Sequence, residues 1–254
     1  MELYRRSGKS AEAATLLADI AEQVGVHECN PLRAKRLHVL AALEVERYRK
    51  KVLDQSATKA GTDVAQATAA TLDTLMTQSS TGAARVLDNA WRGAAAYHYL
   101  LLAHRQLYKG DVDAAMLTAI RLAEFEDVLA PRDIYSLIAL AAYHNRYFAV
   151  CSRAFIKLET LPGVSDSDKE AIQTLAVSIF TQHPPNDPAP LHDVYTNCLE
   201  HGSTYQACVS SGAAIIPGSR QESFMCRTCR YPSLESDAHQ CCPLCHSKAL
   251  HERY

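Results

Sequence analysis

Two cysteine pairs near the end of the chain constrain its fold more than any other feature. Cys226-x2-Cys229 and Cys242-x2-Cys245 are separated by twelve residues. This spacing brings four thiolates around one tetrahedral site, the coordination that structural zinc prefers. We therefore expect residues 205–254 to form a zinc ribbon with one structural zinc ion. A site closed by four cysteines leaves no position for water, so its expected role is structural and not catalytic.

Other residues near the two pairs could substitute as ligands, although they lack the same spacing: Cys241, His239, His246 and His251. A RING-type ubiquitin ligase would need a second, interleaved zinc site. The upstream candidates for such a site also lack paired spacing: Cys198, His201 and Cys208. We expect Cys208 to be buried as a small apolar residue instead.

The composition excludes several partners. The 254-residue chain has a formal net charge of −2, and its last fifty residues carry five basic and four acidic side chains. A nucleic-acid-binding surface would show a basic patch, so no nucleic acid partner is expected. No apolar run reaches 18 residues, and residues 1–6 lack the apolar stretch of a signal peptide. Nine cysteines without a secretion signal indicate reduced thiols and a cytoplasmic location.

Helical periodicity dominates the chain before residue 205. Apolar side chains recur at intervals of three and four residues, and this predicts helices over 11–24, 31–51, 62–78, 93–109, 112–123, 131–143 and 167–181. Pro31 and Pro131 suit first turns, and Gly110 ends one helix where Asp111 caps the next. Ser167-x-x-Glu170 reads as the capping box of the last helix.

Short helices joined by turns of two to five residues predict antiparallel helix pairs. The pattern at 110–115 recurs 35 residues later at 145–150, close to the tetratricopeptide (TPR) period. We therefore predict an all-α protein: a TPR-like α-solenoid over 1–182, a Pro-rich linker over 183–204 and the zinc ribbon. The helical pattern begins within the first dozen residues, so either the solenoid lacks an N-terminal cap or the chain is a piece of something longer.

Catalytic motifs are weak. Gly8-Lys9-Ser10 resembles the end of a phosphate loop, but Leu3 stands where the first glycine should be. His144 and Cys151 fit helix packing better than a catalytic dyad. We expect no enzymatic activity. The apolar residues of the ribbon exceed what fifty residues can bury, so we expect the ribbon to dock on the helices at 147–182.

Several segments together resemble the C-terminal end of a WD-repeat subunit of intraflagellar transport complex A. They are residues 31–48, Ala90-Trp91-Arg92-Gly93 with 96–98 and 105–108, residues 134–140, 154–158 and 208–212, Phe224-Met-Cys226, and Cys242-Pro-Leu-Cys-His246. The resemblance implies a TPR solenoid with a terminal zinc ribbon, preceded in the family by WD-repeat propellers. By the family pattern, the zinc ligands carry over to Cys226, Cys229, Cys242 and Cys245.

The same resemblance implies a non-catalytic scaffold that binds other subunits of complex A. It implies retrograde ciliary transport, ciliary entry of membrane proteins, and a place in the cilium, flagellum and basal body. Two alternatives remain open. A vesicle-coat or tethering-complex subunit uses the same architecture, and a RING-like ubiquitin ligase component would hold two zinc ions where a ribbon holds one.

Overall fold

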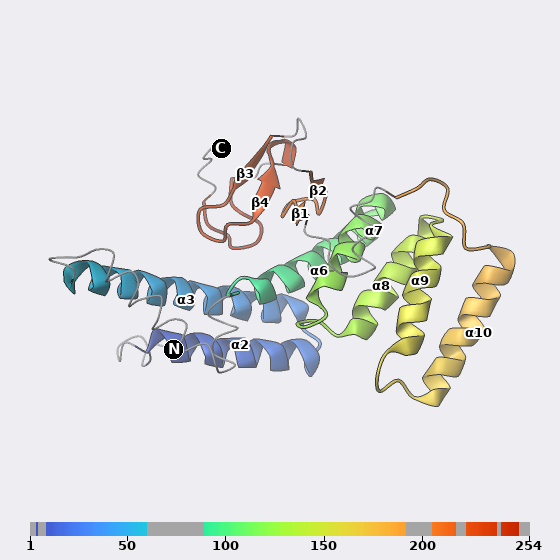
Figure 1. Ribbon diagram of the computed structural model, residues 1–254, viewed down its shortest axis with the longest axis horizontal. Coiled ribbons are helices and arrows are strands. Elements are labelled where there is room, and N and C mark those ends of the chain that lie inside the picture. The colour runs from blue at the N-terminus through green and yellow to red at the C-terminus, as the bar shows by residue number, and fades with distance from the viewer. Residues whose placement is uncertain are drawn as a thin grey trace. The chain divides into compact units, whose positions relative to one another are not determined.

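The computed structural model of the chain describes Tyr4 and residues 9–59, 89–191, 205–216, 222–237 and 240–248. The chain falls into two compact units, residues 1–95 and 96–254. Helices dominate the described residues (Figure 1), which confirms the expected fold class. The helix predicted over 62–78 lies outside them. No helix in the described ranges is long and apolar enough to cross a membrane.

The first unit is built on two helices, α2 (Ser10–Val26) and α3 (Pro31–Lys59), which pack against each other. Both cover the ranges that periodicity predicts. Alanines lie at the buried positions of both helices, including Ala13, Ala14, Ala21, Ala34 and Ala42, each fully buried. Small side chains let two helix backbones approach closely, as the paired helices of TPR repeats require.

His38 of α3 is enclosed within this unit. Gly93 lies so close that a Cβ atom built on it would be 2.5 Å from His38 Nδ1. Burial lowers the pKa of His38 to about 4, from an ordinary value of 6.5. Burial disfavours the charged imidazolium, so this side chain is neutral in the folded protein at pH 7.

The first unit should therefore lose stability in mild acid. The unfolded chain binds a proton at His38 near pH 6.5 but the folded chain only near pH 4, so stability falls as the pH drops between these values. The expected loss is about 3 kcal/mol for this group. Urea unfolding at a series of pH values measures it, with His38→Gln as the control. Equal pH dependence in the two proteins would rule out His38 as the cause.

The second unit stacks its helices in sequence order. They are α6 (Arg92–Lys109, of which residues from 96 onward belong here), α7 (Val112–Arg121) with the 3-10 turn η2 (Leu122–Phe125), α8 (Pro131–His144), α9 (Phe148–Thr160) and α10 (Asp166–Gln182). From α7 to α10, each helix packs on the next (Figure 1). Turns of two to five residues join them, as expected of antiparallel pairs.

The same turn ends α6 and α8. Gly110 has φ +80° and Arg146 has φ +61°. In each turn, the N–H of this residue donates to the carbonyl three positions back, and the next N–H donates to the carbonyl five positions before it. Gly110 and Asp111 thus end one helix and cap the next, as expected. However, Gly110 is equivalent to Arg146 and not to Asn145, so the predicted register is wrong by one residue here.

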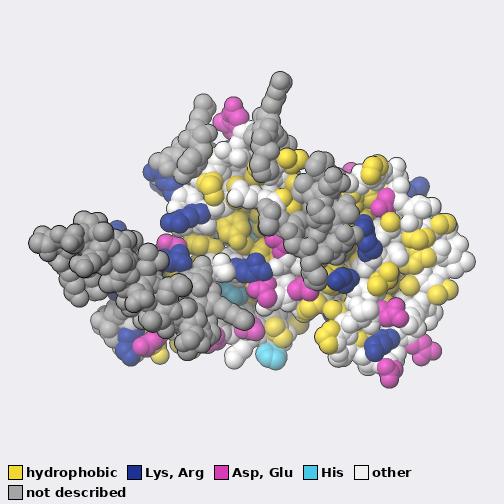
Figure 2. Space-filling view, in the orientation of Figure 1, with side chains coloured by type: hydrophobic (Ala, Val, Ile, Leu, Met, Phe, Trp, Pro, Cys, Tyr) yellow, Lys and Arg dark blue, Asp and Glu magenta, His cyan; other side chains and the backbone are white. Residues whose placement is uncertain are grey.

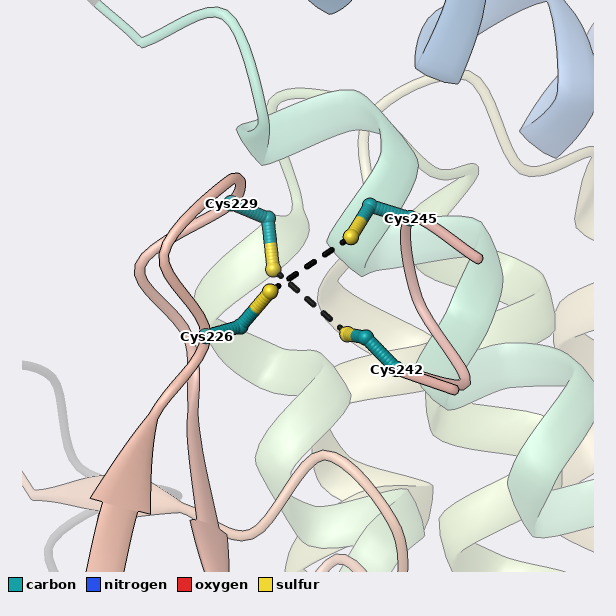
Figure 3. Close-up of side chains that lie close together, drawn as sticks. All are labelled: Cys226, Cys229, Cys242 and Cys245. Carbon is teal, nitrogen blue, oxygen red and sulfur yellow. Dashed lines mark hydrogen bonds between the residues drawn. The ribbon is translucent and has the colours of Figure 1, made fainter. Parts of the chain in front are cut away.

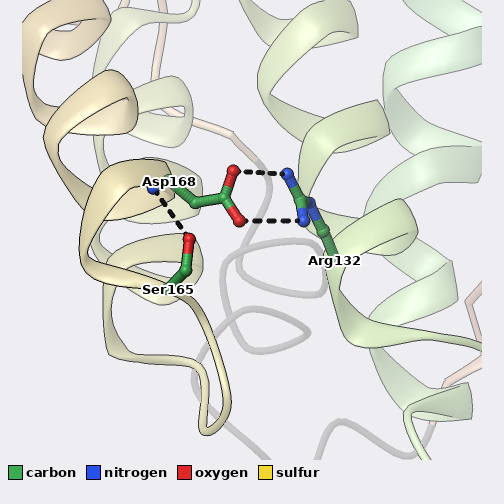
Figure 4. Close-up of polar contacts among 3 residues, drawn as sticks. All are labelled: Arg132, Ser165 and Asp168. Atoms are coloured by element: carbon green, nitrogen blue, oxygen red, sulfur yellow. Dashed lines mark hydrogen bonds and ion pairs between the residues drawn. The ribbon is translucent and has the colours of Figure 1, made fainter.

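The predicted capping box of α10 is displaced by two residues. Ser165 caps this helix: its Oγ accepts a hydrogen bond from the N–H of Asp168 at 3.1 Å (Figure 4). Ser167 lies inside the first turn, because the chain leaves its extended conformation at Ser165. Both serines precede an acidic residue by three positions, so the motif alone could not separate them. Asp168 also pairs with Arg132 of α8, at 3.4 Å between Oδ1 and Nη2.

The segment that follows α10 is packed where it is described. The ring of His183 stacks on Phe148 with centroids 4.7 Å apart. The carboxylate of Asp187 accepts a hydrogen bond from the N–H of Ala149, at 2.9 Å, in the first turn of α9. The beginning of the predicted linker is therefore fixed to the helical stack. Residues 192–204 of that linker lie outside the described residues.

The C-terminal module contains two small antiparallel sheets. β1 (Gln206–Ala207) pairs with β2 (Ala214–Ile215), and β3 (Ser223–Met225) pairs with β4 (Pro232–Leu234), which leads into the 3-10 turn η3 (Glu235–Asp237). Cys208, Ile215 and Leu234 form its apolar core. Cys208 is fully buried, as expected, and its sulfur accepts a hydrogen bond from the N–H of Leu234 at 3.3 Å.

Candidate metal centre

Two loops of the same design carry the paired cysteines. The first loop connects β3 to β4 and starts at Cys226, and the second starts at Cys242. In both, the N–H of the first cysteine donates to the carbonyl five residues on, and its carbonyl accepts from the N–H four residues on. The residue after the second cysteine is left-handed in both, with φ +59° at Arg230 and at His246. Each loop therefore turns both its sulfurs to the same side.

The four sulfurs meet at one point between the loops (Figure 3). All lie within 4.8 Å of one another, and all four cysteines are buried. Cys226 Sγ is 3.6 Å from Cys245 Sγ, and Cys229 Sγ is 3.7 Å from Cys242 Sγ. A tetrahedron with zinc–sulfur bonds of 2.3 Å has edges of about 3.8 Å. The donor set and its dimensions therefore fit a zinc ion.

The sulfurs also influence one another's protonation. Hydrogen bonding with Cys242 and Cys245, followed by burial, raises the pKa of Cys229. Hydrogen bonds from Cys229 and Cys242 lower the pKa of Cys245. The opposite directions arise because adjacent buried thiolates repel, so protons are shared unequally among them. A divalent cation at their centre would stabilise all four as thiolates.

The alternative ligands lie elsewhere. Cys241 is exposed, pairs with Lys248 in a β-bridge, and is outside the group of four. His246 follows the second cysteine pair, but it is exposed and lies outside the group of four. Cys208 belongs to the apolar core. Cys198, His201, His239 and His251 lie outside the described residues. The described ranges contain one cluster of metal-binding side chains.

The cysteines outside this cluster should differ in their rate of alkylation according to their burial. Cys29 and Cys241 are exposed, whereas Cys151 and Cys208 are buried. Burial raises the pKa of Cys151 to about 11, and its sulfur donates to the carbonyl of Ala139. We expect iodoacetamide at pH 7.5 to modify Cys29 and Cys241 at least tenfold faster than Cys151, because the thiolate is the reacting species. Peptide mass spectrometry measures this. Equal rates at Cys151 and Cys29 would contradict the buried placement.

Helix α6 binds the start of the zinc module through backbone carbonyls. Three of its side chains, on one helical face, reach carbonyls of alternate residues in β1 and in the turn that follows it at 209–211. The contacts are His98 Nε2 to Val209 O at 2.6 Å, Tyr99 OH to Ala207 O at 3.0 Å, and Gln106 Nε2 to Ser211 O at 2.8 Å. Tyr99 and Gln106 are two helical turns apart and His98 is adjacent to Tyr99, so one side of α6 reaches every second carbonyl from 207 to 211.

Helix α7 completes this attachment. The guanidinium of Arg121 lies 5.0 Å from the ring centroid of Tyr205. Gly212, with φ +77°, approaches Thr118 so closely that a Cβ atom would lie 2.2 Å from Thr118 Oγ1. The module is therefore docked within the second unit, as expected, but these contacts are made by α6 and α7. The expected site on the helices at 147–182 is wrong.

The reason for this difference is the chemistry of the contact. The docking expectation rested on apolar side chains in the ribbon. Ile215 and Leu234 are instead used in the core of the module itself. Buried polar side chains carry the docking, and carbonyl recognition leaves no pattern in residues 205–212. The detectable signal was on α6, where His98, Tyr99 and Gln106 recur on the face that also buries apolar residues.

Comparison with protein families shows which proteins this architecture resembles. Residues 88–187 match the model described as IFT121-like, TPR repeats, and residues 1–47 match WD repeat-containing protein 35, TPR repeats. Residues 206–250 match the IFT121 second zinc finger domain. The three matched ranges are thus similar to the TPR repeats and the second zinc finger of IFT121-like proteins. The zinc-finger match and the four neighbouring buried cysteines together indicate metal binding.

The particular protein that the chain resembles is WD repeat-containing protein 35. The chain is 38% identical to this protein from Rattus norvegicus over 250 residues, and 39% identical to that from Homo sapiens over 251 residues. Each comparison covers 97% of the chain. The chain spans 21% of the length of these curated relatives. The resemblance noted in the sequence motifs is confirmed along nearly the whole chain.

Proposed function

We propose that this chain is a non-catalytic scaffold region of an intraflagellar transport complex A subunit, and that it binds other subunits of that complex. It would serve retrograde ciliary transport and the ciliary entry of membrane proteins, in the cytoplasm, cilium and basal body. The match to IFT121-like TPR repeats and zinc finger supports this proposal. In this assignment, residues 1–182 form the solenoid, 183–204 the connection and 205–254 the zinc ribbon.

We further propose that Cys226, Cys229, Cys242 and Cys245 hold one structural zinc ion. When bound, the ion supplies a rigid crosslink between the two loops. Four thiolates complete its tetrahedron, so it offers no open position for a reacting water. This closed donor set supports a scaffold over an enzyme. The β-strands of the module are only two or three residues long, so a bound metal would be needed to hold its loops in this arrangement.

The exposed apolar side chains of α10 carry the scaffold proposal. No residue of α10 is buried, and residues 171–182 include no charged side chain. One face packs on α9, where Phe180 meets Phe155 edge to face. Leu175 and Val177 lie on opposite sides of that packed face and are 53% and 66% exposed. Figure 2 shows hydrophobic side chains gathered over this end of the stack. Exposed apolar side chains gathered on one helix are typical of protein–protein contact sites.

Affinity capture from ciliated cells tests this proposal. We expect the chain to capture complex A subunits, and Leu175→Glu with Val177→Glu to reduce that capture at least tenfold, because a charge in an apolar contact must lose its water. Tyr108→Glu is the matched control, since Tyr108 is a 91% exposed hydrophobic residue on α6 and not on α10. Capture of vesicle-coat subunits instead, equally from non-ciliated cells, would overturn the assignment to complex A.

A further inference from the structure

Ser247 lies beside the metal site and is not one of its four cysteines. Its Oγ is 2.9 Å from Cys245 Sγ and 3.4 Å from Cys226 Sγ. These two sulfurs belong to different loops and are themselves 3.6 Å apart. The hydroxyl therefore lies over the edge of the tetrahedron that joins the two loops. Ser247 follows the second cysteine pair by two residues, so its place is fixed by the turn that orients Cys245.

The backbone of Ser247 holds the hydroxyl in this position. Its carbonyl accepts a hydrogen bond from the N–H of Cys242 at 2.9 Å, which closes the second loop. Its N–H donates to the sulfur of Cys245. The left-handed turn at His246 sets the direction of both bonds. Because the backbone already fixes the position of Ser247, its side chain loses little conformational entropy when the hydroxyl points at the sulfurs.

Such a hydroxyl has a specific electrostatic task. Four thiolates around one divalent cation leave an excess of two negative charges on the sulfurs. Backbone N–H groups of Tyr231, Cys245 and Ser247 reach the sulfurs of Cys229, Cys242 and Cys245. The Ser247 hydroxyl adds a donor that also reaches Cys226. Donors to metal-bound groups outside the coordination sphere stabilise the bound state and commonly change metal affinity by about 10- to 100-fold.

We propose that Ser247 is a positioning residue of the metal site, whose hydroxyl donates to the thiolates of Cys245 and Cys226 and slows the loss of zinc. This inference rests on the proposed zinc site. The hydroxyl has one hydrogen, so it bonds the nearer sulfur of Cys245 or is shared with Cys226. It protects these two sulfurs from electrophiles and from protonation, which are the steps that begin metal release.

The test compares Ser247→Ala, Ser247→Thr and Ser236→Ala in the full chain. Ser236 is an exposed serine of the same module, bonded to Asp237, and serves as the control. Zinc transfer to a chromogenic chelator gives the release rate. Absorption of the cobalt-substituted protein reports the thiolate-to-metal charge-transfer bands, which a purely structural role would not move.

We expect Ser247→Ala to release zinc about tenfold faster and to shift the charge-transfer bands, with Ser247→Thr close to the original protein. Ser236→Ala should match the original in both measurements. If Ser247→Ala leaves rate and bands unchanged, or Ser236→Ala changes them equally, the role of Ser247 is refuted while the zinc site stands. A chain that binds neither zinc nor cobalt would refute the zinc site itself, and this inference with it.

Discussion

Replacement of Cys242 by serine should unfold the zinc module and also loosen α6. Loss of one ligand opens the tetrahedron, and metal binding in such small modules supplies on the order of 10 kcal/mol of folding free energy. The carbonyls at 207, 209 and 211 would then leave His98, Tyr99 and Gln106 without these partners. Buried polar side chains that lose their hydrogen bonds destabilise the helix that carries them.

Hydrogen exchange measured by mass spectrometry distinguishes the two effects. We expect complete loss of protection in residues 222–237 and 240–248, and faster exchange in α6. Protection in α8 and α9 should remain close to that of the original chain, because these helices pack mainly on one another and on α7 and α10. Helical circular dichroism should therefore fall only slightly.

Cys241→Ser is the matched control for this experiment. Cys241 is adjacent in sequence, chemically identical and exposed, and it lies outside the cluster of sulfurs. It should leave exchange unchanged throughout. If Cys242→Ser and Cys241→Ser behave alike, the four cysteines do not hold the module together. If exchange in α6 stays slow when the module unfolds, the docking contacts do not stabilise this helix.

Gly212→Ala should detach the module while leaving the metal site intact. The new Cβ would lie 2.2 Å from Thr118 Oγ1, and the backbone φ of +77° is costly for any side chain. Thr118 is fully buried, so it has no room to move aside. Steric overlap in a packed site and left-handed strain together should destabilise the docked state by about 3 kcal/mol.

Two further variants separate these causes. Gly163→Ala places the same side chain at φ +82° with nothing within 4 Å, so it should cost only about 1 kcal/mol of backbone strain. Thr118→Ala in the Gly212→Ala chain removes the overlapping Oγ1 and should restore part of the loss. Chemical denaturation and exchange in residues 205–212 measure all three. Equal effects of Gly212→Ala and Gly163→Ala would show that the close approach to Thr118 is not energetically important.

The sequence was most informative where one residue type has one physical use. Paired cysteines predicted the cluster of four, and periodic apolar residues predicted the helices of both units. Gly110 predicted a helix end because glycine adopts positive φ without strain. The same conformation occurs at Arg146, Arg230 and His246, and these residue types do not predict it. The predicted register between the two repeats is wrong by one residue at Arg146, which is one of these positions.

Contacts between distant segments were less accessible to prediction. Ser165 and Ser167 offer the same capping motif, and the preceding turn decides between them. The docking of the module depends on carbonyl groups, which every residue has, so its location could not be derived from residues 205–212. The hydroxyl of Ser247 reaches Cys226 only because two loops fold against each other. Such contacts require the three-dimensional structure.

The central claim is that Cys226, Cys229, Cys242 and Cys245 hold one zinc ion. Native mass spectrometry of the full chain, purified without chelator and compared with the same sample in acid, counts the bound ions directly. The account predicts one zinc per chain, with these four thiols protected from alkylation until the metal is removed. Two ions per chain, or none with the four thiols freely alkylated, would contradict it.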